Sequence, residues 1–462
     1  MSITPVLRPY QRDGIRHLLT TPDACLFECP GLGKTLQGIL AYVLLKRQEP
    51  NTRMLVVAPL RVAQTVWRQE FKKWEPSADL KVELLHGATK DYRLKIKADV
   101  HVINYEGLAW LERRMKGQEW PWDIVLWDEL TKCKSVGTQR ARWITRHYDK
   151  FDRHWGFTGT PMATKGYMDL FGQIRTIDGG KALGTAKYAY ENMYFYYASP
   201  YDREPTIKRG ASEVITRRIS PLVYQLKAED HLEMPELLTV HHDVEMAEID
   251  ASRYHDLERS MAISVGDSEI TAVSAGVLHN KLKQLVQGFS FDDEGGVIWH
   301  NETKMEALED IVEESAGAPV LVFYHFQPEL AALLKRFPQG VALRRSGAEK
   351  LVQEWNEDKI PLMFASPLSA GHGLNLQLGS ANQIVWLCQN GSPEIYQQAN
   401  GRLYRSGQKN KTVVVHHLNA TSPQGSTVDD DIISMLKNRT TVQEAMLRRL
   451  SSLQRQRACA SG

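Results

Sequence analysis

The segment from Leu26 to Leu45 constrains this chain more than any other. A short apolar stretch leads into a glycine-rich turn, and a helical pattern follows; the turn is Gly31-Leu32-Gly33-Lys34-Thr35. Because glycines have no Cβ, their backbone N–H groups can curl around phosphate oxygens at a helix N-terminus. Lys34 would neutralise phosphate charge and Thr35 would bind Mg²⁺. We predict a nucleotide loop, with a chance loop as the alternative because Glu28 replaces the first glycine of the strict motif.

A pair of carboxylates ends a second apolar stretch. Val125-Leu126-Trp127 leads directly into Asp128 and Glu129. At the end of a buried strand, Asp128 can hold Mg²⁺ while Glu129 orients and deprotonates water. A helix N-cap pair is the alternative interpretation. We favour the catalytic one because the pair lies downstream of the phosphate loop.

Two arginines lie near the C-terminal end, in the segment from Gln398 to Gln408. Arg402 and Arg405 are three residues apart, a spacing that predicts one face of a helix. Two guanidinium groups on one face can stabilise the charge of a phosphoryl group during its transfer. The alternative is a pair of arginines that are solvated or bound to carboxylates.

Short apolar runs typical of strands buried on both faces recur along the chain. They cover residues 54–59, 99–105, 123–126, 319–324, 361–365, 383–387 and 412–416. Each precedes a turn or a helical pattern, and strands that alternate with helices form parallel sheets. The runs form two clusters, at about residues 24–158 and 319–418, with a mostly helical region between them. We therefore predict an α/β fold with two lobes and a C-terminal helix from Asp429 to Arg457.

Composition excludes several classes of protein. No run of about 18 apolar residues could span a membrane, and the N-terminus lacks the pattern of a secretory signal, so we expect an intracellular protein. The five cysteines form no C-x-x-C pair, and we expect reduced thiols and no structural metal. Residues 1–220 contain 35 Lys and Arg against 24 Asp and Glu, a net charge of +11, whereas residues 221–462 contain 22 against 31, a net charge of -9. A basic half can hold a polyanion, although ordinary solvated surface explains it equally well.

Residues 187–204 are rich in tyrosine. Such a segment could stack on bases. The helical spacing of the tyrosines favours packing against a neighbouring lobe instead.

In their order along the chain, these motifs resemble helicase superfamily two and, within it, the Swi/Snf-type ATPases. The resemblance covers nearly the whole chain and implies two RecA-like lobes that use ATP and Mg²⁺. It implies nucleotide contacts at Arg8, Gln11, Gly373 and Gln398, with Gln11 on the adenine. It implies coupling of the phosphate site to a nucleic-acid track through Thr158 and Thr160, and track contacts at Pro59, Arg61 and Asn104.

The sequence departs from the family at three places. Leu130-Thr131 follows the acidic pair where the family usually has Ala-His, so the histidine contact to the coupling motif is missing. Pro367-Leu368 replaces the usual Thr-Lys, which is similar to the annealing-helicase branch. Gly401 replaces an Asp, as in the wider superfamily. The superfamily is thus better defined than the branch.

The resemblance implies a Mg-ATP-dependent translocase that moves along duplex DNA, with Arg402 and Arg405 completing the site when the lobes close. We expect a first lobe at residues 1–225, a second at 226–425 and a helical segment at 426–462. Compact motors of this kind resemble those of bacteriophages and bacteria, so we expect a monomer in the cytoplasm of a bacterium or a phage-infected cell, with the nucleus left open. A strand-separating helicase on single-stranded DNA or RNA is the first alternative, and a non-hydrolysing scaffold is the second.

Overall fold

The structure is a computed structural model, and it describes residues 3–29, 31–162, 165–197, 205–226, 233–265, 272–292, 294–344, 347–370 and 374–438. The chain divides into two compact units, Met1–Leu232 and Glu233–Gly462. Among the described residues, no helix is both long enough and apolar enough to cross a lipid bilayer.

A seven-stranded parallel sheet forms the centre of the first unit, with the order β3-β4-β2-β5-β6-β1-β9. Its strands are β1 (Asp23–Glu28), β2 (Met54–Ala58), β3 (Val82–Leu84), β4 (Val100–Asn104), β5 (Ile124–Asp128), β6 (Arg153–Thr158) and β9 (Val223–Leu226). All five residues of β2 are buried, as expected for a strand covered on both faces. The parallel order brings the carboxyl ends of β1, β5 and β6 to one edge of the sheet.

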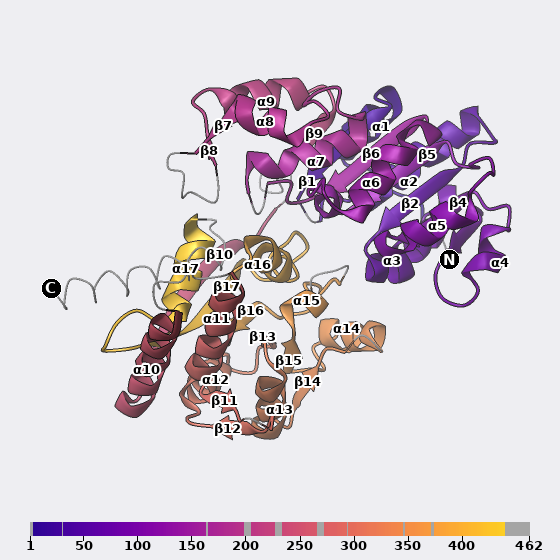
Figure 1. The fold of residues 1–462 in the computed structure, drawn as a ribbon. Helices are drawn as coiled ribbons and strands as arrows, with labels where there is room; N and C mark the ends of the chain where they lie inside the picture. The colour runs from indigo at the N-terminus through magenta and orange to yellow at the C-terminus, as the bar shows by residue number, and fades with distance from the viewer. Residues whose placement is uncertain are drawn as a thin grey trace. The chain divides into compact units, whose positions relative to one another are not determined.

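Helices cover both faces of this sheet (Figure 1). They are α1 (Pro9–Thr20), α2 (Lys34–Gln48), α3 (Leu60–Lys73), α4 (Lys90–Leu94), α5 (Leu108–Arg114), α6 (Gln139–His147), α7 (Tyr167–Asp178), α8 (Lys187–Tyr194) and α9 (Ala211–Ile219). One apolar core joins α1, α2 and α3 to the sheet, and a second joins α5 to α9 to it. A short hairpin of β7 (Phe195–Tyr196) and β8 (Thr206–Ile207) follows α8.

The tyrosine-rich segment packs, as we favoured, but within its own unit. Tyr190 and Tyr194 of α8 are buried, and the ring of Tyr190 lies 5.1 Å from that of Phe171 on α7. Tyr188 is 75% exposed, so the helix is amphipathic. Residues 198–204 lie outside the described residues.

The second unit contains a six-stranded parallel sheet with the order β10-β17-β16-β13-β15-β14. Its strands are β10 (Glu236–Glu245), β13 (Val320–Phe323), β14 (Gly340–Ala342), β15 (Leu362–Ala365), β16 (Gln383–Trp386) and β17 (Thr412–Thr421). Its helices are α10 (Glu248–Val265), α11 (Ala272–Val286), α12 (Thr303–Glu314), α13 (Gln327–Arg336), α14 (Ala348–Asn356), α15 (Pro367–Ala370), α16 (Pro393–Asn400) and α17 (Val428–Asn438). A hairpin of β11 (Phe289–Phe291) and β12 (Val297–Trp299) completes it. The prediction of two parallel-sheet lobes is confirmed.

One strand was not predicted. β10 lies in the region that we expected to be mostly helical, and it pairs in parallel with all ten residues of β17. Most residues of β10 are exposed because the strand is at the edge of the sheet. An exposed edge strand needs no apolar run, and this one therefore lacks the signal that identified the buried strands.

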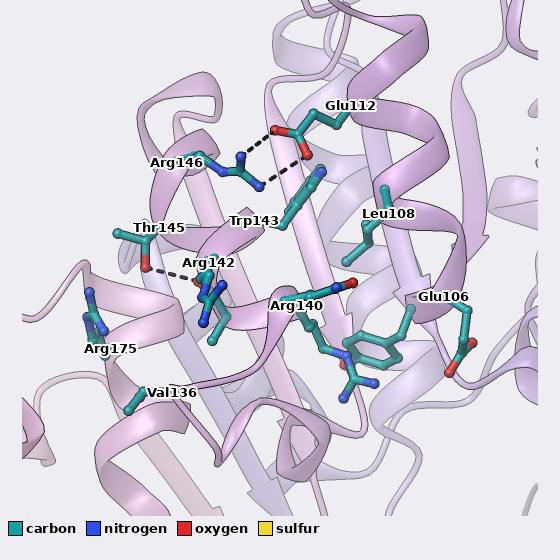
Figure 2. Close-up of a pocket in the computed structure, with 14 residues that line it drawn as sticks. Glu106, Leu108, Glu112, Val136, Arg140, Arg142, Trp143, Thr145, Arg146 and Arg175 are labelled. Carbon is teal, nitrogen blue, oxygen red and sulfur yellow. Dashed lines mark hydrogen bonds and ion pairs between the residues drawn. The ribbon is translucent and has the colours of Figure 1, made fainter.

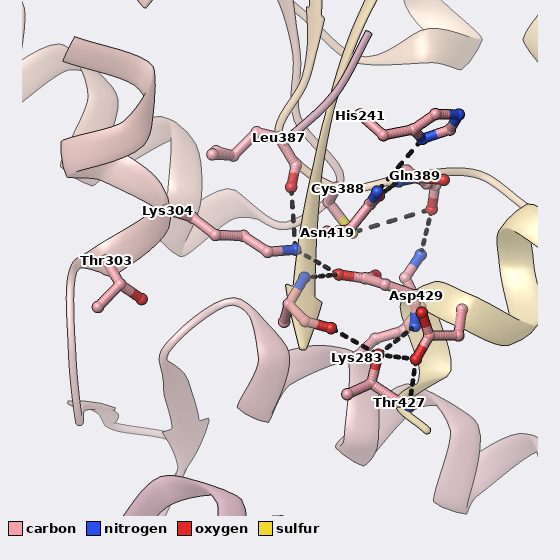
Figure 3. A network of polar contacts seen from close by, with 12 residues as sticks. His241, Lys283, Thr303, Lys304, Leu387, Cys388, Gln389, Asn419, Thr427 and Asp429 are labelled. Atoms are coloured by element: carbon pink, nitrogen blue, oxygen red, sulfur yellow. Dashed lines mark hydrogen bonds and ion pairs between the residues drawn. The ribbon is translucent and has the colours of Figure 1, made fainter. Parts of the chain in front are cut away.

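The C-terminal helix begins near the predicted residue, at Val428, and is described to Asn438. Its first acidic residue does more than complement the helix dipole: Asp429 is fully buried, and its Oδ2 lies 2.6 Å from Nζ of Lys304 on α12. The same oxygen accepts a hydrogen bond of 2.9 Å from the backbone N–H of Ala420 on β17. Figure 3 shows the contact between Lys304 and Asp429. Lys283 of α11 donates to the backbone oxygen of Gln389 at 3.0 Å. This buried network joins three helices to the second sheet.

Candidate active site

The glycine-rich turn connects the carboxyl end of β1 to α2. Gly31 and Gly33 have positive φ angles of 97° and 86°, which a residue with a Cβ adopts only with strain. α2 begins at Lys34, directly after Gly33, so the first N–H groups of this helix face the turn. A Cβ on Gly33 would lie 2.6 Å from Nε2 of Gln11, so any other residue there would displace this amide from its hydrogen bond to Leu32. Thr35 is in the first turn of α2.

The N-terminal motif is attached to this turn. Nε2 of Gln11 donates to the backbone oxygen of Leu32 at 3.0 Å, and Oε1 of Gln11 accepts from the backbone N–H of Arg8 at 3.1 Å. Gln11 is buried, whereas Arg8 is exposed at the N-cap of α1. The structure therefore places both predicted nucleotide contacts beside the loop, and the adenine contact of Gln11 stays a prediction.

Lys34 lies in a cluster of acidic groups. Its ammonium donates to the backbone oxygens of Glu28 and, at 3.3 Å, Cys29. Desolvation lowers the pKa of Lys34, and the charges of Glu28, Glu129 and Asp128 oppose that shift. Desolvation also raises the pKa of Glu28 to about 7. Lys34 is thus near both acidic residues of β5 and its turn, although it lies far from them in the sequence.

Asp128, the last residue of β5, is held by a tryptophan. Nε1 of Trp67 on α3 donates to Oδ2 of Asp128 at 2.8 Å, and Trp67 has no exposed surface. Desolvation raises the pKa of Asp128, while the bond from Trp67 and the charge of Lys34 lower it. One carboxylate oxygen is therefore fixed by the indole, which orients the group as a metal ligand must be oriented.

Glu129 has an unusual backbone conformation and two hydroxyl partners. Its φ of 59° is in the left-handed region, which is strained for a residue other than glycine and is found at functional sites. Oε1 of Glu129 accepts hydrogen bonds from Oγ1 of Thr131 at 2.6 Å and of Thr158 at 3.4 Å. The backbone N–H of Thr160 donates to Oγ1 of Thr158 at 3.2 Å. The predicted base and the predicted coupling residues thus form one chain of hydrogen bonds.

Thr131 occupies the position where the family usually has histidine, and the structure assigns it a direct contact with the carboxylate. It belongs to a 3₁₀ turn, Leu130–Cys133, that follows Glu129 directly. The motif thereby retains a donor at this position. Neither Thr131 nor Trp67 has a local sequence signal that predicts a place in the site; only their side-chain contacts with Glu129 and Asp128 show it.

The two arginines of the second unit are not on a helix, and this prediction was wrong. α16 ends at Asn400, whose Oδ1 accepts a hydrogen bond of 2.9 Å from Trp386, and turns follow it. Nη1 of Arg402 donates to the backbone oxygen of Leu374 at 3.1 Å, and Nη1 of Arg405 donates to Oδ1 of Asn375 at 2.8 Å. Both guanidinium groups therefore converge on one short loop.

The other predicted nucleotide contacts of the second unit are Gln398 and Gly373. Gln398, on α16, donates from Nε2 to Oε1 of Glu394 at 3.4 Å. Gly373 lies outside the described residues. Desolvation lowers the pKa of Arg405, which is half-buried, and Arg402 is buried.

The predicted track contacts lie at the carboxyl ends of β2 and β4. Pro59 is the N-cap of α3, and Arg61 is in the first turn of that helix. Asn104, the last residue of β4, is 7% exposed, and its Nδ2 donates to Oε2 of Glu106 at 2.7 Å. Arg61 is therefore the more accessible of the two polar candidates.

The first-unit residues fit a magnesium nucleotide. The turn has the backbone conformation of a phosphate cradle, and the helix that follows it has 15 residues and thus a substantial dipole. A half-buried cation and a fixed carboxylate lie beside it, which are the groups that phosphate and Mg²⁺ require.

Comparison with known proteins gives consistent matches over the whole chain. A model of the SNF2-related domain matches residues 10–286. Protein p41 of the Acyrthosiphon pisum secondary endosymbiont phage 1 is 33% identical, over 95% of this chain and 97% of p41. YwqA of Bacillus subtilis, named as an ATP-dependent helicase/translocase, is 24% identical over 96% of this chain and 49% of YwqA. The nuclear protein STH1/NPS1 of Saccharomyces cerevisiae is 23% identical over 96% of this chain and 36% of that protein.

The chain thus spans nearly all of p41 but less than half of YwqA and of STH1/NPS1. Among solved structures, the SWI2/SNF2 ATPase core of Sulfolobus solfataricus in complex with dsDNA is similar, with 23% identity and a TM-score of 0.44 over 95% of this chain and 92% of that one.

Proposed function

The chain belongs to the SNF2-related family and has its helicase-like ATPase core, and from this premise we propose that it hydrolyses ATP to move along duplex DNA. The observation that carries the proposal is the cluster in the first unit, where the turn before α2, Asp128 and Glu129 come together around Lys34. A loop of this kind binds nucleotide phosphates, and an adjacent carboxylate that can take a proton from water makes hydrolysis the natural reaction.

Each residue of the cluster has a distinct proposed role. Lys34 would exchange its carbonyl partners for phosphate oxygens, and Thr35 and Asp128 would bind Mg²⁺. Bound Mg-ATP supplies the phosphoanhydride bond and the metal charge that offsets the negative charge developing on the phosphates. Glu129 would accept a proton from water, while the hydroxyls of Thr131 and Thr158 hold its carboxylate in place through Oε1.

Arg402 and Arg405 are proposed to complete the site from the second unit. Two cations that converge on one loop suit a γ-phosphate, on which charge spreads over three oxygens. Their contribution would require closure of the two lobes, so that hydrolysis and movement are coupled.

We propose DNA as the partner, since the basic first half suits a polyanion and YwqA is named as a helicase/translocase. From the similarity to a phage protein, we propose that the protein acts in the cytoplasm of a bacterium or a phage-infected cell. We also propose that the chain acts as a monomer.

The first test compares ATPase rates with no nucleic acid, single-stranded DNA, blunt duplex DNA and RNA. A translocase that follows one strand of an intact duplex should be stimulated by duplex at least as strongly as by single strands. Stimulation by single-stranded DNA or RNA alone would replace the translocase with a strand-separating helicase. Absence of turnover under all four conditions, with ATP still bound, would leave a non-hydrolysing scaffold.

Thr131 offers a second test that is specific to this sequence. Thr131→Val keeps the shape of the side chain but removes the donor to Glu129, and a hydrogen bond to a charged group contributes about 1.5–3 kcal/mol. We therefore expect kcat to fall by about tenfold or more, with little change in the KM for ATP. Thr131→Ser should restore kcat, since it returns the hydroxyl.

Thr20→Val is the matched control, because Thr20 is an exposed residue at the end of α1 and, among the described residues, its hydroxyl donates only to backbone oxygens of its own helix. A kcat for Thr131→Val equal to that of this control would show that Thr131 does not position the base.

A further inference from the structure

A pocket of about 910 Å³ lies in the first unit, apart from the phosphate loop. It is lined by residues of the 3₁₀ turn Tyr105–Gly107 and of α5, α6 and α7 (Figure 2). Four of these residues are arginines and two are glutamates; they are Arg140, Arg142, Arg146, Arg175, Glu106 and Glu112. Nothing in the proposed ATPase cycle uses this pocket.

The positive charge of the pocket is only partly neutralised. Glu112 binds Arg146, with oxygen–nitrogen distances of 3.1 and 3.2 Å. Glu106 is engaged by Asn104. Within the part of the chain that the structure describes, Arg142 and Arg175 have no carboxylate partner. Two guanidinium groups that line one pocket and have no carboxylate partner among the described residues are available to bind an anion there.

Arg140 connects this pocket to the acidic pair. Its guanidinium group lies 4.7 Å from the ring centre of Tyr105, and its Nη1 donates to the backbone oxygen of Lys132 at 2.5 Å. Its Nε is buried and makes no hydrogen bond within the described residues. The hydroxyl of Tyr105 donates in turn to the backbone oxygen of Asp128 at 2.8 Å. One wall of the pocket is therefore bonded to the turn that carries Asp128 and Glu129.

Tyr105 is a permanent donor in this chain of contacts. Burial raises the pKa of Tyr105 well above its ordinary value, so that the hydroxyl keeps its proton. A shift of Arg140 would therefore displace the ring of Tyr105 and, through the hydrogen bond of its hydroxyl, the backbone of Asp128. This requires no rearrangement of the sheet.

We propose that this arginine pocket is a second binding site for the phosphodiester backbone of duplex DNA, which signals to the Asp128–Glu129 turn through Arg140 and Tyr105. The inference rests on the proposed function, and it adds a DNA contact to those predicted at the carboxyl ends of β2 and β4. The planar fork of arginine matches phosphate oxygens. The aromatic rings here offer no platform for bases, since Arg140 covers Tyr105 and Trp143 is 2% exposed. The pocket also adjoins Asn104 through Glu106, so it continues the proposed track.

The test uses the full chain with the double variant Arg142→Ala/Arg175→Ala, and measures duplex affinity against salt concentration. Each lost phosphate contact should reduce the steepness of log K against log salt by about 0.9, so that the double variant should lose about 1.8. The control is Arg47→Ala/Arg217→Ala, which removes the same charge from exposed positions on α2 and α9. It should keep the slope of the parent protein.

Equal slopes for the two double variants would overturn the inference. Any change in the salt dependence of duplex binding would then come from net charge alone, and not from the pocket. The inference would also be overturned if the variant Arg142→Ala/Arg175→Ala lost binding to a poly-glutamate peptide while its duplex binding was unchanged. That result would make the pocket a protein-docking site. If the parent protein itself bound no nucleic acid, the proposed function would fail instead, and the two failures are thus distinguishable.

The signalling step has its own readout in Tyr105→Phe, which keeps the ring and removes the donor. We expect unchanged duplex affinity and a fall in the ratio of DNA-saturated to DNA-free turnover. A proportional fall of both rates, which leaves the ratio unchanged, would show that Tyr105 only supports the fold.

Discussion

Glu129→Gln is expected to lower kcat by at least about 10²-fold while Mg-ATP still binds nearly as tightly as to the parent protein. The amide keeps the size of the side chain, and its oxygen can still accept from Thr131 and Thr158, but it cannot take up a proton from water. Steady-state turnover and calorimetric affinity for ATP measure the two halves of this expectation.

One contrasting variant and one control are compared with Glu129→Gln. Lys34→Ala should show the opposite pattern, with a large loss of nucleotide affinity, because phosphate charge would be left uncompensated in the loop. Glu83→Gln removes a carboxylate from β3 of the same sheet and should alter neither quantity. A Glu129→Gln protein whose kcat stays within about a factor of ten of the parent would rule out Glu129 as the base.

Lys304→Met is expected to lower the free energy of unfolding of the second unit by about 3–5 kcal/mol, since it leaves the buried carboxylate of Asp429 without its cation. Both side chains are almost completely buried, at 4% and 0% exposure, so water cannot replace the lost partner. Urea denaturation would measure the loss of stability. Because a chain of two units need not unfold in one step, hydrogen exchange in peptides from α12 and α17 would show where the loss occurs.

The matched change is Lys359→Met, which breaks an ion pair with Glu357 of 2.6 Å between exposed side chains and should alter stability little. The double variant Lys304→Met/Asp429→Leu should recover much of the stability, since it removes both charges together. If Lys304→Met were no more destabilising than Lys359→Met, the network would not hold α17 on the sheet.

Much of the fold could be predicted because its signals are local. A strand buried on both faces needs an uninterrupted apolar run, as in β2 and β13, and a phosphate turn needs glycines directly before a lysine. Such patterns extend over a few residues and can be recognised without the rest of the chain. The order of the motifs then identified the family, which the comparisons confirm.

Where local signals are absent, prediction failed. β10 is exposed at a sheet edge and has no apolar run, and its partner β17 lies far along the chain, from Thr412 to Thr421. The spacing of Arg402 and Arg405 suggested a helix, yet α16 ends before them because tertiary contacts of Asn400 and Gln408 stabilise turns there.

By itself the sequence determined the parallel sheets, the glycine-rich turn before a helix and the acidic pair at the end of a strand, since each depends on neighbouring residues. Only the tertiary structure decided how the acidic pair is supported: Trp67 reaches Asp128 across 61 positions, and Thr158 reaches Glu129 across 29. The physical reason is that a hydrogen bond depends on the distance between two atoms in space, and the crossing order of the parallel strands, rather than any local pattern, brings those atoms to the same edge of the sheet.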